Sequence, residues 1–309
     1  MKITRHKTIP FQIANPIIND GAALNKRMNS DGYLFFQGLL DQDSILEVRR
    51  SITRLCAEAG WISPDSDPME ATAAPDVKWV EPQPEFMAVY NKVMRLECFH
   101  VLAHQPAISK VVEQITQDQV LVHPRNIARI IFPNNEKYTT PAHQDYIHIQ
   151  GTEQTYTAWI PLGECPQSLG SLAILAGSHR LGLLPTHFAY GAGACGIDTD
   201  ALDLLWVCGD FHLGDFVLFH SLTVHKGLLN RSPNQIRLSV DYRYQGIGQP
   251  VTKDSLLPHF AQLTWEEIYR EWRNTKHQYY WTKFPLHLVE FSPKFVQEHD
   301  VQESRITSE

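Results

Sequence analysis

Pro141-Ala142-His143-Gln144-Asp145 is the stretch that decides the fold predicted for this chain, and Val224-His225-Lys226-Gly227 completes it further along the sequence. Two imidazoles and one carboxylate can occupy one face of an octahedral metal ion. Neutral imidazole nitrogens together with a hard carboxylate oxygen suit Fe(II), and three coordination positions stay open for other ligands. His143, Asp145 and His225 are therefore the predicted metal ligands.

A His-x-Asp pair is a weak signal when it stands alone. Chance produces it often in a chain with 15 histidines, and an isolated histidine is usually a hydrogen-bonded core residue. Arg237 and Ser239 strengthen the interpretation, because they follow His225 at the centre of an alternating, strand-like segment. Strand periodicity puts both side chains on one face, where a buried arginine would form a fork for a carboxylate. A metal triad with a carboxylate fork is typical of an oxygenase that depends on iron and 2-oxoglutarate. The alternative for Arg237 is a surface ion pair.

Composition limits the class of protein. The chain has 309 residues, of which 43% are hydrophobic and 20% charged, so it can form one or two ordinary globular domains. A net charge of −7 argues against a nucleic-acid partner. We find neither a signal peptide nor an apolar run long enough to cross a membrane. The five scattered cysteines lack metal-binding spacing, which indicates reduced thiols and a cytoplasmic location.

The pattern of elements predicts one domain that is mainly β with α decoration. Residues 1–118 form a helical N-terminal part, with a strand at 33–36, a helix from Asp41 or Asp43 to Gly60, a long loop at 63–85 and a helical region at 85–116. Residues 119–250 form a β core, and residues 251–309 a helical extension. In that extension, a capping box at Thr264–Glu267 begins a helix running to about Lys276. The predicted core strands are 120–132, 155–161, 172–175, 215–219 and 236–244.

Short, regular strands of this kind indicate a β-sandwich or a barrel. Together with the two-histidine pattern, they predict a double-stranded β-helix, a jelly-roll relative of the cupins, whose open mouth holds the metal.

The order of the motifs resembles the phytanoyl-CoA dioxygenase family of non-haem iron enzymes over nearly the whole chain. The residues that carry the resemblance are 31–36, 143–145, 158–159, 170–172, 177–180, 214–215, His225, Arg237 and Ser239. The resemblance implies a double-stranded β-helix flanked by N-terminal and C-terminal helices. It also implies Fe(II), 2-oxoglutarate and O2, with release of succinate and CO2. The expected reaction is oxidation of an unactivated C–H bond, most simply hydroxylation, in a small molecule such as a secondary metabolite.

The resemblance also implies roles for individual residues. His143, Asp145 and His225 would bind the iron, and Arg237, assisted by Ser239, would pair with the distal carboxylate of 2-oxoglutarate. Trp159 would line the 2-oxoglutarate pocket, although a plain core tryptophan would look the same in the sequence. Related halogenases replace the carboxylate with a small residue, so Asp145 favours hydroxylation, desaturation or ring chemistry.

The strand before the motif has two faces. Asn126, Ala128 and Ile130 share one, while Arg125 and Arg129 share the other. The resemblance puts the first face inward and makes Asn126 a candidate contact of the cosubstrate.

Substrate contacts are only weakly indicated. Tyr146, His148 and Gln150 alternate just after the motif and could face the cavity; further candidates are Trp206, Phe211 and His212. The acidic balance offers no basic channel for a coenzyme A tail, which favours a free small molecule. A peptide or protein hydroxylase of the same fold and a non-catalytic barrel that binds metal or a small molecule remain alternatives. The oligomeric state, the substrate and the choice between hydroxylation, desaturation and cyclisation are left open.

Overall fold

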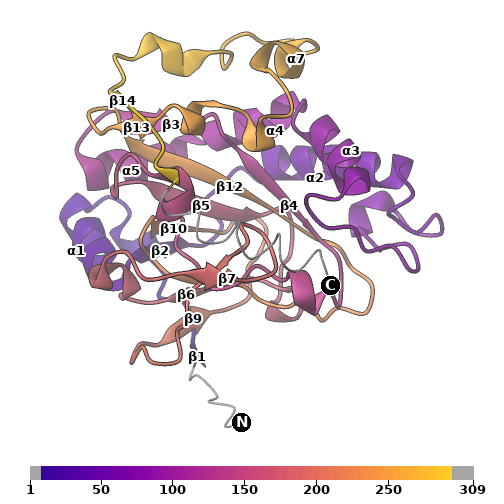
Figure 1. The fold of residues 1–309 in the computed structure, drawn as a ribbon, viewed down its shortest axis with the longest axis horizontal. Helices are drawn as coiled ribbons and strands as arrows, with labels where there is room; N and C mark the ends of the chain where they lie inside the picture. Colours follow the sequence, from indigo (N-terminus) through magenta and orange to yellow (C-terminus); the bar gives the residue numbers. More distant parts are fainter. Residues whose placement is uncertain (1–7, 294–309) are drawn as a thin grey trace.

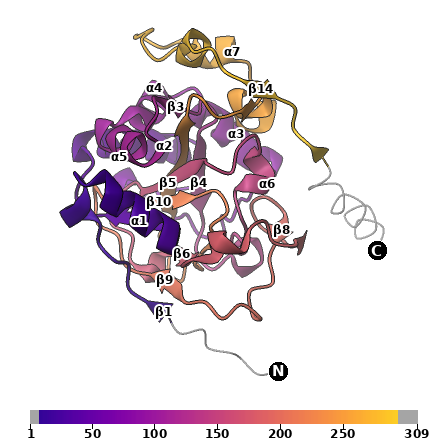
Figure 2. The ribbon, with the colours of Figure 1, turned by 90° about the vertical axis from the view of Figure 1, so that its left-hand side faces the viewer.

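The computed structural model describes residues 8–293 as two facing β-sheets with helices packed against the larger one (Figure 1). The α-helices are α1 (Gly21–Asp31), α2 (Gln42–Glu58), α3 (Pro84–Val93), α4 (Glu97–Val101), α5 (Pro106–Thr116), α6 (Tyr146–Ile149) and α7 (Trp265–Tyr269). Helices α1, α2, α4 and α5 lie together on one side of the molecule, whereas α7 lies at one end with β14 (Figure 2).

The larger sheet has the strand order β2-β10-β5-β12-β3, and β4 pairs with β12 beside β3. Its strands are β2 (Tyr33–Phe36), β10 (Phe216–His220), β5 (Tyr156–Pro161), β12 (Arg237–Gly246), β3 (Val120–Val122) and β4 (Ile127–Ile131). The smaller sheet has the order β1-β9-β6-β11, with β1 (Thr8–Ile9), β9 (Trp206–Cys208), β6 (Leu172–Leu175) and β11 (His225–Gly227). Two short pairs join β7 (His187–Phe188) to β8 (Cys195–Gly196) and β13 (Val251–Thr252) to β14 (Leu288–Val289).

Strands of the larger sheet are buried on both faces, because helices cover one face and the smaller sheet covers the other. In β2, Leu34 and Phe36 join the core beneath the helices, while Tyr33 and Phe35 join the core between the sheets. This double burial explains why β2 reads as a continuous apolar run rather than as an alternating one.

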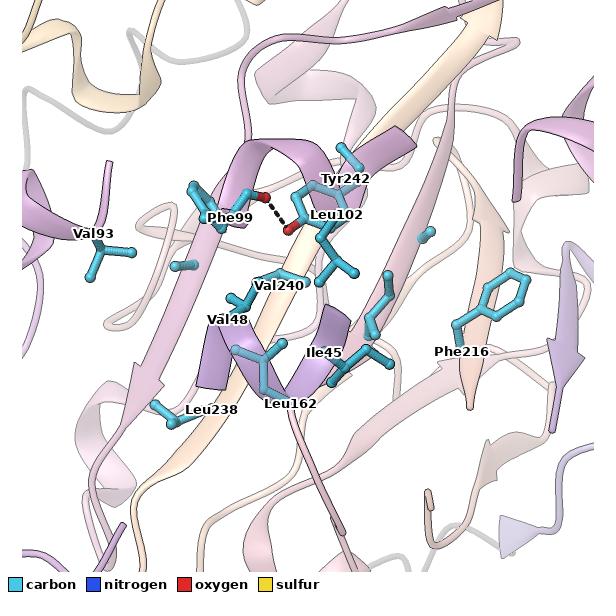
Figure 3. Packing of buried hydrophobic residues seen from close by; sticks show 14 of the residues in the cluster. Ile45, Val48, Val93, Phe99, Leu102, Leu162, Phe216, Leu238, Val240 and Tyr242 are labelled. Carbon is cyan, nitrogen blue, oxygen red and sulfur yellow. Dashed lines mark hydrogen bonds between the residues drawn. The ribbon is translucent and has the colours of Figure 1, made fainter. Parts of the chain in front are cut away.

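Helix α2 shows how the helices attach to the sheet. The Asp41 carboxylate, one of the two caps that the sequence offered, accepts a hydrogen bond from the Ser44 amide at 2.9 Å. Its buried residues Ile45 and Val48 belong to the same core as Leu238 and Val240 of β12, and Figure 3 shows Val48 next to Val240. Burying this apolar stripe holds the outer face of β12 against the helical layer.

Strand β12 separates two environments by its period of two. Residues 238, 240, 242 and 244 are apolar or aromatic and belong to the core under the helices. In Figure 3 the Tyr242 hydroxyl donates to the Phe99 carbonyl, at 2.6 Å. Arg237, Ser239, Asp241 and Arg243 alternate with them and point to the other face. The strand therefore delivers a row of polar groups to the space between the sheets.

Some predicted boundaries were wrong, and local contacts explain them. The expected strand 120–132 is two strands, β3 and β4, separated at 123–126, where Pro124 has no N–H for the ladder. The capping box at Thr264 is present, but α7 ends at Tyr269 instead of continuing to Lys276. A few residues further on, the backbone amides of Arg273 and Asn274 donate hydrogen bonds to the Glu97 carboxylate, at 2.9 and 3.1 Å, and not to carbonyls of a continuing helix.

In the part of the chain that the structure describes, no helix has both the length and the apolar character needed to cross a membrane.

Candidate metal and cosubstrate site

His143 and His225 are brought together by an antiparallel backbone bridge between His143 and the first residue of β11. The amide of each residue donates to the carbonyl of the other, at 3.0 Å in both directions. Asp145 follows two residues later, and its Oδ1 lies 3.7 Å from His143 Nε2 and 3.9 Å from His225 Nε2. The ligand atoms of the three buried side chains all lie within 4.8 Å of one another. The three predicted ligands therefore converge on one point.

The hydrogen bonds of the two rings fix which nitrogen is free. His143 Nδ1 lies 2.8 Å from the Pro141 carbonyl, and His225 Nδ1 lies 3.0 Å from the Thr223 carbonyl. A carbonyl can only accept, so each Nδ1 carries the proton and each Nε2 lone pair points toward Asp145. Burial lowers the pKa of His225 to about 3, which keeps that ring neutral and able to bind a metal. Two neutral imidazoles and a carboxylate on one face fit Fe(II).

Asp145 is held by two neighbours. The Thr157 hydroxyl donates to its Oδ2 at 2.6 Å, and Arg243 Nη2 lies 3.3 Å from its Oδ1. Burial raises the pKa of Asp145, but the Arg243 guanidinium beside it holds that pKa well below the ordinary value. The carboxylate is therefore ionised at neutral pH and oriented for a metal.

Arg237 lies in a smaller pocket next to the triad. Its side chain is buried, Ser239 accepts a hydrogen bond from its Nη1, and its guanidinium carbon is 5.8 Å from the centre of the Trp159 ring. Its Nε has no hydrogen-bond partner among the described residues. Burial lowers the pKa of Arg237, because a charged group is costly to keep away from water. An anionic group such as the distal carboxylate of 2-oxoglutarate fits this arrangement.

The same pocket brings together most of the predicted cosubstrate residues. It is lined by Arg129, Thr140, His143, Asp145, Thr157, Trp159, Leu172, Phe219, His225, Gly227, Arg237 and Asp241. Ser239 is not part of this lining, but its hydroxyl accepts a hydrogen bond from Arg237. Metal ligands and carboxylate fork thus share one cavity wall.

Asn126 is an exception, and the inward face predicted for its strand was wrong. Its amide contacts His100 Nδ1 at 3.1 Å on the helical side of the sheet. Ala128 and Ile130 join the core beneath the helices, whereas Ile127 and Arg129 line the cavities. Both faces of the strand are buried, so apolar content could not identify the inner one.

A larger cavity of about 490 Å³ adjoins the triad and contains His143 and Asp145 in its wall. His148 lines it, as the sequence suggested. Gln150 does not act there: its side chain exchanges hydrogen bonds with the backbone of Ser292, at 2.9 and 2.7 Å. Residues 146–149 form helix α6 rather than an alternating segment. Of the weaker candidates, Phe211 and Trp206 are buried in apolar clusters, and exposed His212 pairs with Glu164.

Sequence reasoning missed several polar residues of the site, among them Thr157, Arg129 and Arg243. A signal for two of them was present. Arg243 has the same strand parity as Arg237, and Thr157 lies two positions before Trp159 on the same face.

Comparisons with known proteins identify the family of the chain. The family model described as phytanoyl-CoA dioxygenase (PhyH) matches residues 28–239. The 1-deoxypentalenic acid 11-beta-hydroxylase of Streptomyces arenae is 27% identical over 248 residues, covering 74% of this chain and 83% of the relative. Its counterpart in Streptomyces exfoliatus is 25% identical over 244 residues, with the same coverage.

Among solved structures, the epimerase SnoN in complex with Fe3+, alpha ketoglutarate and nogalamycin RO has a TM-score of 0.50 and 20% identity. The match covers 74% of this chain and 84% of that one, and it supports the fold. The chain belongs to the phytanoyl-CoA dioxygenase family, and it is an iron- and 2-oxoglutarate-dependent dioxygenase.

Proposed function

We propose that this dioxygenase hydroxylates an unactivated C–H bond of a small molecule, with His143, Asp145 and His225 as iron ligands and Arg237 as the anchor of 2-oxoglutarate. The proposal rests on one observation. The Nε2 atoms of His143 and His225 and the ionised carboxylate of Asp145 converge next to the buried guanidinium of Arg237, whose Nε–H has no partner among the described residues. We further propose that the two facing sheets form a double-stranded β-helix flanked by helices, within a single cytoplasmic domain. The free cysteines support that location.

Each residue has a defined task in this proposal. Bound iron would supply the activation of O2, coupled to oxidation of 2-oxoglutarate to succinate and CO2. Arg237 holds the distal carboxylate of the cosubstrate, while Ser239 and the Trp159 ring fix the plane of the guanidinium. Thr157 and Arg243 keep Asp145 ionised and correctly rotated.

A small molecule is the substrate class that the larger cavity favours. Its volume of about 490 Å³ falls within the range of small-ligand pockets, roughly 300–1,000 Å³. The curated relatives are named as hydroxylases of 1-deoxypentalenic acid, a small molecule. A peptide hydroxylase would instead need an extended groove for the peptide backbone.

The test is an anaerobic titration of metal-free protein with Fe(II) and 2-oxoglutarate, following the visible charge-transfer band between iron and the keto acid. We expect the band in the parent protein, and we expect it to be weakened in Asp145→Ala and Arg237→Ala. Arg231→Gln, a change at an exposed position, should leave it unaltered. Absence of the band from folded, iron-loaded parent protein would refute the cosubstrate assignment. Formation of the band without any succinate under O2, across trial substrates, would favour a binding barrel.

A further inference from the structure

We propose that the substrate carries a carboxylate, bound by the guanidinium groups of Arg125 and Arg243 in the cavity beside the metal ligands. The inference names the substrate class of the proposed active site and so rests on the proposed function. The cavity wall contains both side chains together with His143 and Asp145.

Arg125 is a cation that no carboxylate of the described residues contacts directly. Its side chain is partly buried, and its hydrogen bond goes to the backbone carbonyl of Asp254 at 3.5 Å. Within residues 8–293 it forms no ion pair, although the Asp254 carboxylate is near enough to attract it. Burial and the neighbouring Arg243 guanidinium lower the pKa of Arg125. Two like charges in one buried cavity repel each other unless an anion lies between them.

Arg243 is only partly satisfied. One terminal nitrogen contacts Asp145, but its Nε is buried and has no partner among the described residues. Bound iron would draw on the same Asp145 carboxylate, which would leave this guanidinium with less compensation. A planar guanidinium with free donors is suited to a carboxylate, which can accept two parallel hydrogen bonds.

Arg129 provides an internal comparison, because it lines the same cavity with its charge fully matched. Its Nε donates to Asp241 at 2.9 Å, and its Nη1 lies 3.3 Å from Glu81. These contacts show how the chain neutralises a buried arginine when no outside ligand is needed. Arg125 lacks any such arrangement.

The remaining wall indicates the body of the substrate. Its apolar groups are Ile127, Ile149, Ala192, Phe260, Phe291 and Pro293. The wall also contains His123, Ser255, His259 and two further carboxylates, of which Glu81 is paired with Arg129 and Asp254 lies near Arg125. His148 also lines the cavity, and its Nε2, which has no hydrogen-bond partner within residues 8–293, can add one hydrogen bond. The cavity therefore suits an apolar skeleton with one carboxylate, held close to the iron ligands.

The experiment compares matched ligands. Adamantane-1-carboxylate, its primary amide and the phosphate monoester of 1-adamantanol are titrated calorimetrically into the protein loaded with Fe(II) under anaerobic conditions. Saturating 2-oxoglutarate is present, so that Arg237 is occupied. We expect the carboxylate to bind at least tenfold more tightly than the amide. Arg125→Gln should abolish that preference, Arg125→Lys should retain part of it, and Arg231→Gln should keep all of it.

Three results would overturn the proposal: equal affinity for acid and amide, an undiminished preference in Arg125→Gln, or tighter binding of the phosphate ester. The iron charge-transfer band is recorded in the same samples. If the parent protein shows no band, the proposed function is contradicted. If the band is present but the carboxylate binds no more tightly than the amide, only the carboxylate site is contradicted. Arg243→Gln is a secondary variant, because this residue also contacts Asp145.

Discussion

At the scale of single residues, the orientation of Asp145 is decided by a hydroxyl that is not itself a ligand. Thr157 lies on β5, inside the larger sheet, and donates to the carboxylate oxygen that Arg243 does not contact. Thr157 contacts Oδ2 of Asp145, and Arg243 contacts Oδ1. Rotation of the carboxylate away from the histidines would break at least one of these contacts.

We therefore expect Thr157→Val to weaken iron binding about tenfold, because partners behind metal ligands typically contribute 10- to 100-fold. Thr157→Ser keeps the hydroxyl and should restore most of the affinity. The measurement is an anaerobic Fe(II) titration, with circular dichroism to verify folding. Equal affinities for the parent and both variants would show that Thr157 does not orient the carboxylate.

At the scale of elements, β12 is the strand on which the site depends. Its even-numbered residues anchor it under helices α2 and α4, and its odd-numbered residues supply Arg237, Ser239, Asp241 and Arg243 to the interior. Val240 is completely buried at the centre of the strand.

Val240→Ala should lower the free energy of unfolding by about 2 kcal/mol, since it removes buried methyl groups and leaves a cavity. Val101→Ala is the matched control, because Val101 is 37% exposed and lies in helix α4. We expect the control to change stability by less than about 0.5 kcal/mol. Urea unfolding measures both variants. Similar losses at the two positions would contradict the role assigned to the β12 core.

Strand periodicity predicted β12 correctly and β4 incorrectly, for a physical reason. On β12 the apolar and polar residues alternate, so the face that points to the site could be assigned from the sequence. On β4 the apolar Ala128 and Ile130 pack beneath the helices, while charged Arg129 faces the site and is neutralised by Asp241 and Glu81. Those two carboxylates lie far away in sequence. The face of Asn126 could be assigned only from tertiary contacts.

At the scale of the whole molecule, several histidines are enclosed in places where they cannot easily be protonated. Burial lowers the pKa values of His100, His123 and His220 to about 4 from an ordinary value of 6.5. Between these two values the unfolded chain binds more protons than the folded chain. Stability is therefore complete above pH 6.5 and falls as the pH decreases toward 4.

His100 is the cleanest test, because it lies in the core away from the metal ligands. Its contribution to this loss should be about 2 kcal/mol between pH 7 and pH 5, from a linkage of about 1.4 kcal/mol per pKa unit. His100→Gln should reduce the pH dependence of the unfolding free energy, even if it lowers stability at pH 7. Urea unfolding at both pH values measures this difference. An unchanged pH dependence would mean that His100 is protonated as easily in the folded protein as in water.

The composition and net charge predicted a globular protein, but they did not predict which charged groups line its cavity. The net charge of −7 gave no hint that Arg125, Arg129 and Arg243 gather around one internal space. These residues are separated in sequence and meet only because β4 and β12 pair. The metal ligands were easier to predict, because their chemistry needs specific residue types at short spacing.

The wall of the large cavity is completed by Phe291 and Pro293, which reach it after the β13–β14 pairing. The family match ends at residue 239, so these residues and those at 254–260 belong to a part of the chain outside it. One end of the cavity wall thus lies in a different stretch of the chain from His143, Asp145 and His225, although Arg125 and His148 of the same wall lie within the family match. Substitutions confined to residues 254–293 would therefore reshape that end of the cavity while leaving the three predicted metal ligands unchanged.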